Sequence, residues 1–525
     1  MATRRRNQTP QSVLLVQGDA ARVASIPAPV GGWNARDSIA NMEREDAVTL
    51  LNMFPNVSNV VLRGGYTEHA TGLPGQVESL FDYAGANTSY LFAVSGGSIY
   101  DVTSAGAVGA PVVTGLSNSR WEYTNVSTSG GHYIYAANGV DVPLLYDGST
   151  WTSITGVSTP AITGVTTTTL ESPTLFKNRV WFIQNNTLKA WYLPTAAIAG
   201  AAQALDLSSI AQHGGELVAM SSWTIDAGYG LDDNLVFFTS KGEAIVYRGT
   251  DPANSATWAL IGVWYLGVPV GKRCTVKYGG DVLIISYYGL LPLSTALQSD
   301  RIDPRVALSD KIQGAFATAT QQYGSSFGWQ IVVDNRNNAV YVNVPVAVGQ
   351  QQQYVMNNIT RSWCQFSGWA ANCWDIYNDV AYFGGDSVVC KAWQSNYQDG
   401  DNDIQTNSLQ AFNYFEARGV KKYFTRARPS IFTDGEPSIF IGVNVDFNTA
   451  DVTSALSFSP SPVGLWDVGV WDTALWGSGL TITNNWNGIV GEGYCAAINL
   501  KSASSGVQIE WASTDVVYQL GWGGI

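Results

Sequence analysis

A unit of two short strand-like runs separated by a polar turn returns roughly every 40 to 55 residues between Tyr90 and Trp393. Each copy joins two β-branched and aromatic runs through Gly, Asn or Asp, a pattern typical of antiparallel hairpins. A repeat of that length built only of strands predicts the blades of a β-propeller. The copies include YLFAVSGGSIY at 90–100, HYIYAANGVDVPLLYDGSTW at 132–151, RVWFIQNNTLKAWY at 179–192 and NLVFFTSKGEAIVYRGTDPANSATW at 234–258, with further copies at 281–294, 329–344 and 380–393.

The composition favours the same class of fold. The chain of 525 residues holds 54 Gly, 25 Tyr and 19 Trp, but only 13% of its residues are charged. Aromatic side chains suit half-buried pleated surfaces and Gly suits tight turns, so long surface helices are not expected. We therefore predict an all-β chain with a propeller of six or seven blades and additional N-terminal and C-terminal β regions.

Changes in local composition divide the chain into four parts. The start is polar and lacks periodicity, Pro and Gly punctuate the next segment, and a polar, acidic stretch near residues 394–404 reads as a linker after the repeats. The expected parts are a mobile arm (1–27), a strand and short-helix segment (28–75), the propeller (76–395) and a C-terminal β domain (396–525).

Two short helices are predicted outside the strand pattern. Asp46–Phe54 could form one or two helical turns that end at Pro55. Within the repeats, Ile312, Phe316 and Ala319 recur at helical spacing after Ser309, a possible N-cap. The second segment predicts one amphipathic helix inserted between blades.

Charge and cysteine usage exclude several classes of function. A net charge of −13 argues against tight binding to phosphate backbones, because that affinity comes mostly from Lys and Arg. The five cysteines are an odd number without a C-x-x-C pair, which indicates synthesis in a reducing compartment. The longest apolar stretch, Val282–Leu293, is too short for a membrane helix, so no stable membrane insertion is expected.

Two motifs resemble functional sites but lack essential parts. Residues 324–328 fit G-x-S-x-G, yet a nucleophile elbow needs a strand–turn–helix and a later His, and all three histidines lie upstream. Residues 399–403 alternate carboxylates as calcium loops do, but the required Gly and Glu are missing, which favours a solvated linker. No zinc, phosphate or nucleotide motif is present either, so we predict no catalytic residues, no metal and no cofactor.

Two clusters are candidates for contacts with other proteins. In a strand, Lys422, Arg426 and Arg428 would share one face, which is either a solvated surface or a docking surface for an acidic neighbour. Three tryptophans spaced by five residues match neither strand nor helix and could be core plugs or interface anchors. The candidate interface residues are Arg418, Lys421, Lys422, Arg426, Arg428, Trp466, Trp471 and Trp476.

Three stretches together resemble one family. GGWNARDSIANMEREDAVTLLNMFPNVSNVVLRGGY at 31–66, YFEARGVKKYFTRARP at 414–429 and LWDVGVWDTALWG at 465–477 are similar to the tail tube nozzle proteins of short-tailed, podovirus-type bacteriophages. The resemblance implies a structural virion protein, not an enzyme. Such a protein forms a sixfold ring below portal and adaptor, extends the DNA channel and closes it until infection.

The resemblance also implies partners and a location. Expected partners are further copies of the chain in a hexameric ring, the adaptor protein, tail fibres or spikes, and viral DNA in transit. The expected location is the virion tail, after assembly in the cytoplasm of the host bacterium. The alternative is a receptor- or glycan-binding tail protein, possibly a glycan hydrolase, which would need paired carboxylates and stacking aromatics at the propeller axis.

Overall fold

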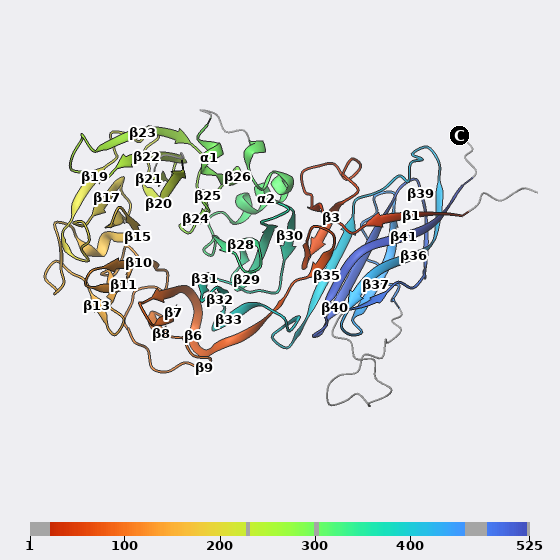
Figure 1. Ribbon diagram of the computed structural model, residues 1–525, viewed down its shortest axis with the longest axis horizontal. Helices are drawn as coiled ribbons and strands as arrows, with labels where there is room; N and C mark the ends of the chain where they lie inside the picture. Colours follow the sequence, from red (N-terminus) through yellow and green to blue (C-terminus); the bar gives the residue numbers. More distant parts are fainter. Residues whose placement is uncertain (1–20, 227–230, 299–303, 457–479, 522–525) are drawn as a thin grey trace, which may run out of the picture.

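The computed structural model describes residues 21–226, 231–298, 304–456 and 480–521. A propeller-like ring of antiparallel sheets lies beside a second region in which two sheets share a core (Figure 1). The predicted all-β class with a β-propeller arrangement is therefore confirmed. Within the described residues, no helix is long and apolar enough to cross a membrane.

Most sheets of the ring are antiparallel meanders whose strands follow one another in sequence. Three of them have four strands each: β10 (Glu122–Thr128), β11 (Gly131–Ala137), β12 (Leu144–Tyr146) and β13 (Trp151–Ser153); β15 (Leu170–Phe176), β16 (Arg179–Gln184), β17 (Lys189–Tyr192) and β19 (Gln203–Asp206); β20 (Leu217–Asp226), β21 (Leu231–Thr239), β22 (Glu243–Gly249) and β23 (Trp258–Tyr265).

The remaining sheets of the ring follow the same plan with small variations. One of them has three strands, and the short strands β14 (Ile162–Thr163) and β18 (Gly200–Ala201) pair separately. The other strands are β6 (Gly65–Ala84), β7 (Ser89–Ser95), β8 (Ser98–Asp101) and β9 (Gly106–Ala107); β24 (Thr275–Tyr278), β25 (Asp281–Ser286) and β26 (Gly289–Pro292); β27 (Gln330–Asp334), β28 (Ala339–Ala347), β29 (Gln350–Asn357) and β30 (Trp363–Phe366); β31 (Cys373–Tyr377), β32 (Val380–Gly384) and β33 (Asp386–Gln394).

Two-residue turns join neighbouring strands where the sequence predicts hairpins. Gly96 and Gly97 both have positive φ between β7 and β8, and Asn378 and Asp379 do so between β31 and β32. Two positive φ values in succession match the right-handed twist of the flanking strands, and Gly, Asn and Asp adopt them at least cost. The structure thus has hairpin turns at the positions that the sequence predicted.

Strand β6 closes the ring. Its first half pairs with β33, from Gly65 opposite Gln394 to Gln76 opposite Asp386, and its second half pairs with β7 from Val77. One strand therefore completes the last sheet and begins the first. The propeller arrangement starts at Gly65 and not at the predicted residue 76, because the closing strand precedes the first repeat.

The first strand of each sheet lines the axis of the ring (Figure 1). These inner strands contact one another in the order β6, β10, β15, β20, β24, β27 and β31, and β31 contacts β6 in turn.

The predicted inserted helix is present as α2 (Gln313–Tyr323). Ile312, Phe316 and Ala319 are buried, as the spacing predicted. The Ser309 hydroxyl does not cap the helix, because it accepts a hydrogen bond from the amide of Leu290 at 2.9 Å. The other helical segments are short: η1 (Thr167–Thr169), α1 (Leu293–Ala296), η2 (Pro304–Val306) and η3 (Asp310–Ile312).

The second region combines both ends of the chain. One sheet runs β38-β36-β41-β5-β4, with β1 beside β41 and β39 beside β36, and β3, β35, β40 and β37 pair in order in the other. The strands are β1 (Arg22–Pro27), β2 (Gly32–Trp33), β3 (Asp46–Leu51), β4 (Met53–Pro55), β5 (Val60–Leu62), β34 (Gln398–Asp399), β35 (Asn402–Gln410), β36 (Lys422–Thr433), β37 (Ser438–Val445), β38 (Thr481–Thr483), β39 (Asn487–Gly493), β40 (Ala496–Ser504) and β41 (Ile509–Leu520).

Three predictions for the N-terminal part were wrong. Arg22–Pro27, expected in a mobile arm, form β1, which pairs with β41. Asp46–Phe54 are not helical, because β3 pairs with β35 and the next residues form β4. The segment 28–75 is not separate, since its strands complete the C-terminal sheets and the propeller. Residues 1–20 lie outside the described part of the chain.

A buried ion pair holds the two regions together where a linker was predicted. Arg63 is 0% exposed and binds both carboxylate oxygens of Asp399, at 2.8 and 2.5 Å. Its guanidinium also donates to the carbonyl of Ser367 at 2.6 Å and lies over the ring of Trp369. The prediction of a solvated linker at residues 399–403 is therefore wrong for Asp399, which is a buried structural residue. Residues 401–403, in the turn between β34 and β35 and the start of β35, are exposed.

Candidate functional site

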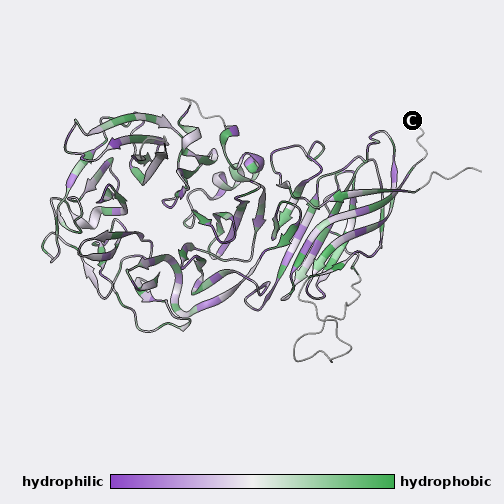
Figure 2. Cartoon of the chain, viewed as in Figure 1, coloured by the Kyte–Doolittle hydropathy of each residue, from purple (hydrophilic) through white to green (hydrophobic). Residues whose placement is uncertain are grey.

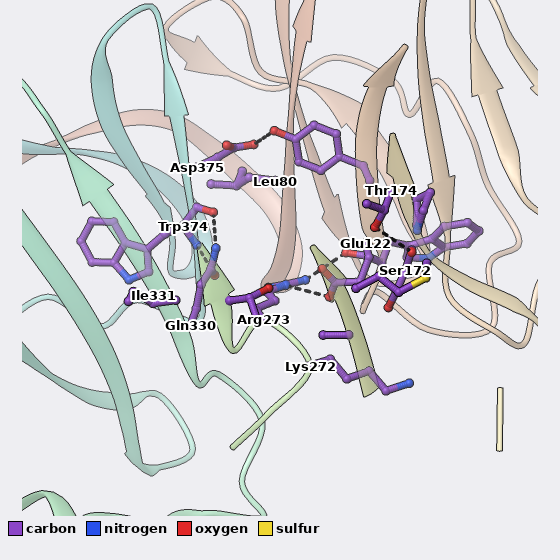
Figure 3. Close-up of a pocket in the computed structure, with 16 residues that line it drawn as sticks. Leu80, Glu122, Ser172, Thr174, Lys272, Arg273, Gln330, Ile331, Trp374 and Asp375 are labelled. Carbon is purple, nitrogen blue, oxygen red and sulfur yellow. Dashed lines mark hydrogen bonds and ion pairs between the residues drawn. The ribbon is translucent and has the colours of Figure 1, made fainter. Parts of the chain in front are cut away.

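The axis of the propeller holds a polar cavity of about 260 Å³. Side chains from the inner strand of every sheet in the ring line it (Figure 3). A second cavity of about 390 Å³ shares Glu122, Ser172, Lys272 and Arg273 with it, so the two adjoin along the axis. This axial chamber is the principal candidate site of the described residues.

Arg273 crosses the chamber from the β24 side. Its Nε donates to Glu122 Oε1 at 3.0 Å, and its Nη2 donates to Ser79 Oγ at 2.8 Å and to the Trp121 carbonyl at 3.0 Å. Ser79 lies in β6, Glu122 is the first residue of β10, and Trp121 directly precedes it. The Arg273 side chain therefore connects the sheet that begins with β24 to the first two sheets of the ring, which are far from it in sequence. Figure 3 shows the guanidinium directed at the Glu122 carboxylate.

A second polar group lies where the ring closes. The Asp375 carboxylate accepts hydrogen bonds from the Tyr123 hydroxyl at 2.7 Å and from the amide of Asp82 at 3.0 Å. Burial raises the pKa of Asp375 to about 7, and burial raises that of Asp82 to about 6. Three inner strands thus meet at one carboxyl group that changes its charge near neutral pH.

One ion pair and two cation–π contacts lie at the mouth of the chamber. Lys272 Nζ lies 2.6 Å from Glu171 Oε2, and burial raises the pKa of Glu171. The centre of the Phe327 ring lies 4.2 Å from the Arg120 guanidinium carbon and 5.5 Å from the Arg273 guanidinium carbon. The loop that carries Phe327 is therefore fixed over the axis by cation–π contacts.

The charged and aromatic side chains of this chamber are already engaged in contacts within the protein. Glu122 is paired with Arg273, and Asp375 accepts from Tyr123 and two backbone amides. Trp121 and Trp374 are buried, so neither offers a ring face for stacking on a ligand. In the described ranges, no three His, Cys, Asp or Glu side chains are placed to hold a metal ion.

The sequence did not single out the residues of this chamber. Arg273 and Glu122 are 151 positions apart and Tyr123 and Asp375 are 252 apart, so no local motif links them. All five residues of the G-x-S-x-G stretch, 324–328, line the second cavity of the chamber. It follows helix α2 without opening one, as the sequence indicated.

The basic cluster does not form one face. A register shift between Phe424 and Arg426 places Lys422 inside and leaves Arg426 exposed. Lys422 is 0% exposed, and its Nζ donates to the carbonyls of Ala417, Val420 and Tyr494 at 2.5 to 2.8 Å. The prediction that Lys422, Arg426 and Arg428 share a face was therefore wrong, because a bulge reverses the alternation of side chains.

The other cluster residues lie at the surface and have neighbours in the chain. Lys421 pairs with Glu492 at 2.5 Å, and Arg428 pairs with Asp515 at 2.6 Å. The Arg418 guanidinium lies 4.4 Å from the ring centre of Tyr414. The candidate anchors Trp466, Trp471 and Trp476 lie outside the described residues.

The burial of Lys422 leads to a stability prediction. Lys422→Met should lower the free energy of unfolding by about 1 to 3 kcal/mol, because three buried carbonyls lose their donor. Burial lowers the pKa of Lys422. The cost of burying the charged ammonium group therefore offsets part of the stability that its three hydrogen bonds contribute. Urea unfolding checks the value, with Lys421→Met at the neighbouring exposed position as control. Equal unfolding midpoints for the two variants would contradict the structural role of Lys422.

Two comparisons of the sequence with known proteins find no match, and a comparison of the structure finds remote likenesses. No protein-family model matches the chain, and no curated protein matches it either. The N-terminal part of BBS1, solved in complex with ARL6 and soaked with mercury, matches with 9% identity and a TM-score of 0.38, over 63% of this chain and 97% of its own.

Two other solved structures show the same level of likeness. The β-propeller domain of Cps50 (Swd1) from Myceliophteria thermophila matches with 10% identity and a TM-score of 0.36, over 61% of this chain and 99% of its own. An exo-β-1,3-galactanase from Phanerochaete chrysosporium matches with 8% identity and a TM-score of 0.25, over 75% and 95%. Likenesses this weak assign no function.

Proposed function

We propose that this chain is a structural protein of a phage virion: a tail nozzle subunit that assembles into a sixfold ring below portal and adaptor. The ring extends the DNA channel and retains the genome until ejection. Tail fibres or spikes attach to the same assembly. The chain itself catalyses no reaction in this proposal, and it acts as a rigid scaffold.

The observation that carries the proposal is where the resembling stretches lie. Residues 31–66 and 414–429, far apart in sequence, both supply strands to the second region. The first of these stretches also supplies Arg63, which binds Asp399 at the junction with the propeller. Two of the three stretches that carry the resemblance therefore belong to one structural unit, and the third, residues 465–477, lies outside the described residues.

The propeller fits a scaffold role. We propose that it has seven blades, since β6, β10, β15, β20, β24, β27 and β31 each begin one sheet around the axis. Arg273 crosses the axial cavity of about 260 Å³ and is paired there with Glu122, so in this proposal the propeller axis is not a channel. DNA would therefore pass between copies, along the axis of the ring.

The glycan-binding or glycan-hydrolysing alternative has one observation in its favour. Asp375 and Glu122 line the same polar cavity, and a raised pKa such as that of Asp375 is common in general acids. Both carboxylates already have partners in the chain, however, and we therefore rank this function second. Binding on a glycan array, or cleavage of a bacterial polysaccharide by the purified chain, would favour it.

The proposal predicts an oligomer that weakens with salt. Charge pairs at an interface steer and select partners and are screened by ions. The apparent dissociation constant should rise by about tenfold or more between about 0.05 and about 0.5 M salt. Sedimentation velocity over a range of concentrations measures this change. A chain that stays monomeric at every concentration and at low salt would contradict the proposal.

A further inference from the structure

The chain contains two Asn-Gly pairs, Asn138-Gly139 in the propeller and Asn487-Gly488 in the second region. In such a pair the backbone amide nitrogen of Gly can attack the side-chain carbonyl carbon of Asn, because Gly has no Cβ to obstruct the approach and bends easily. The surrounding structure decides whether the two groups can meet. The two pairs of this chain lie in very different surroundings.

The pair in the propeller is held by hydrogen bonds. Asn138 is 8% exposed, and its Nδ2 donates to Asp141 Oδ2 at 2.8 Å. Its Oδ1 accepts from the amides of Val140 and Asp141 at 3.0 and 2.7 Å. The Gly139 amide, which would be the attacking group, donates to the carbonyl of Leu170 at 2.9 Å. Both groups are therefore fixed in other contacts.

The pair in the second region lies at the surface, where β39 begins. Residues 484–486, directly before it, belong to no helix or strand. Gly488 is exposed, and a Cβ added there would meet no atom within 4 Å. The Asn487 side chain donates to the carbonyl of Asn485 at 2.8 Å, in a hydrogen bond that is exposed to water. Neighbouring side chains therefore leave room for the attack.

The pairing of β39 with β36 is interrupted next to this site. Asn487 lies opposite Ala427, and Gly488 lies opposite Arg426. The next two residues of β39 lie opposite Thr425 alone, so the register shifts there. Figure 2 shows hydrophobic and hydrophilic residues interspersed along this sheet. Strand ends with exposed backbone and few pairings open locally at low cost, which lets the chain bend as the attack requires.

Positive charge near the site favours the same reaction. Arg426 is exposed and is the cross-strand neighbour of Gly488. The Arg428 guanidinium lies 4.8 Å from the ring centre of Trp486, the residue before Asn487. The attacking amide must lose its proton, and nearby cations favour the negative charge that this leaves on its nitrogen.

We propose that Asn487 is a site of spontaneous deamidation. The Gly488 nitrogen gives its proton to the solvent and forms a bond to Cγ of Asn487. The bond from Cγ to Nδ2 breaks, and Nδ2 takes up a proton from the solvent and leaves as ammonia. Water then opens the resulting cyclic imide and leaves aspartate or isoaspartate at position 487. This inference does not depend on the ring proposed above.

The two products differ in their effect on β39. Aspartate adds a negative charge beside Arg426 and keeps the length of the backbone. Isoaspartate adds a carbon atom to the backbone, so the residues after it no longer match the pleat of β36. The modification therefore changes both the charge and the strand pairing at this edge of the second region.

Peptide mapping by mass spectrometry tests the site. The folded chain is incubated at mildly alkaline pH and digested at intervals, and conversion is followed in the peptides that contain Asn487 and Asn138. We expect conversion at Asn487 to be at least about tenfold faster than at Asn138. In urea, where the fold no longer holds either pair, the two rates should become similar.

Gly488→Ala is the matched variant. It adds a Cβ in open space at a residue outside the left-handed region, so the fold should be unchanged. Conversion at Asn487 should slow several-fold, because the Cβ obstructs the attacking nitrogen. Equal rates at Asn487 and Asn138 in the folded chain would overturn the proposal. Conversion as fast in Gly488→Ala as in the wild type would also overturn it, since the Gly488 nitrogen would then not be the attacking group.

Discussion

Replacing Arg63 by Ala is expected to lower the free energy of unfolding by about 3 to 5 kcal/mol. Asp399 would remain buried without its counter-charge, and the carbonyl of Ser367 and the side chain of Asn52 would lose a donor. Leaving a buried charge unpaired costs far more than losing an exposed ion pair. Urea unfolding followed by tryptophan fluorescence measures the loss.

Arg36 provides the matched control for Arg63. Like Arg63, Arg36 forms ion pairs, in its case with Asp37 and Asp310. Its side chain, however, is 43% exposed. Arg36→Ala should therefore cost less than about 1 kcal/mol. If the two arginine variants unfold at the same urea concentration, the junction does not depend on the buried pair.

Stability should fall as the pH rises from about 5 to about 8, by about 3 kcal/mol from Asp375 alone. The pKa of Asp375 is about 7 in the folded chain, above its ordinary value of 3.8. Between these values the folded state holds a proton that the unfolded state has lost, so each unit of pH lowers the free energy of unfolding. Above pH 7 both states are ionised and the loss ends.

Two variants isolate the contribution of Asp375. Asp375→Asn removes the titrating group, so the slope of the unfolding free energy against pH should become smaller. This holds even if the substitution changes the stability by a constant amount at every pH. Tyr123→Phe removes a hydrogen bond that favours the ionised form, so the decline should extend to higher pH. Urea unfolding at half-unit steps of pH checks both, and an unchanged slope in Asp375→Asn would refute the role given to this carboxyl group.

The elements predicted well from the sequence are those set by local pattern. The hairpin at Gly96 and Gly97 and helix α2 follow from turn chemistry and from residue spacing, which act over a few positions. Asp46–Leu51 was mistaken for a helix because its strand pairing is with β35, more than 350 positions away. The local strand propensity of a segment does not reveal a pairing partner so distant in the sequence.

The candidate sites show the same limit. Lys422 was placed on the wrong face because the bulge at Thr425 has no sequence signal. Arg273, Glu122, Tyr123 and Asp375 were missed because they meet only when distant sheets close around an axis. The contacts of Lys421, Lys422 and Arg428 within the chain could be assigned only from the three-dimensional structure.

The central proposal is that this chain builds a ring and not a catalytic site. The most direct measurement is electron microscopy of the purified chain at low salt, with class averages of its assembly. We expect closed rings of six copies around a central opening. Single particles the size of one chain, or open filaments without a closed ring, would contradict the account.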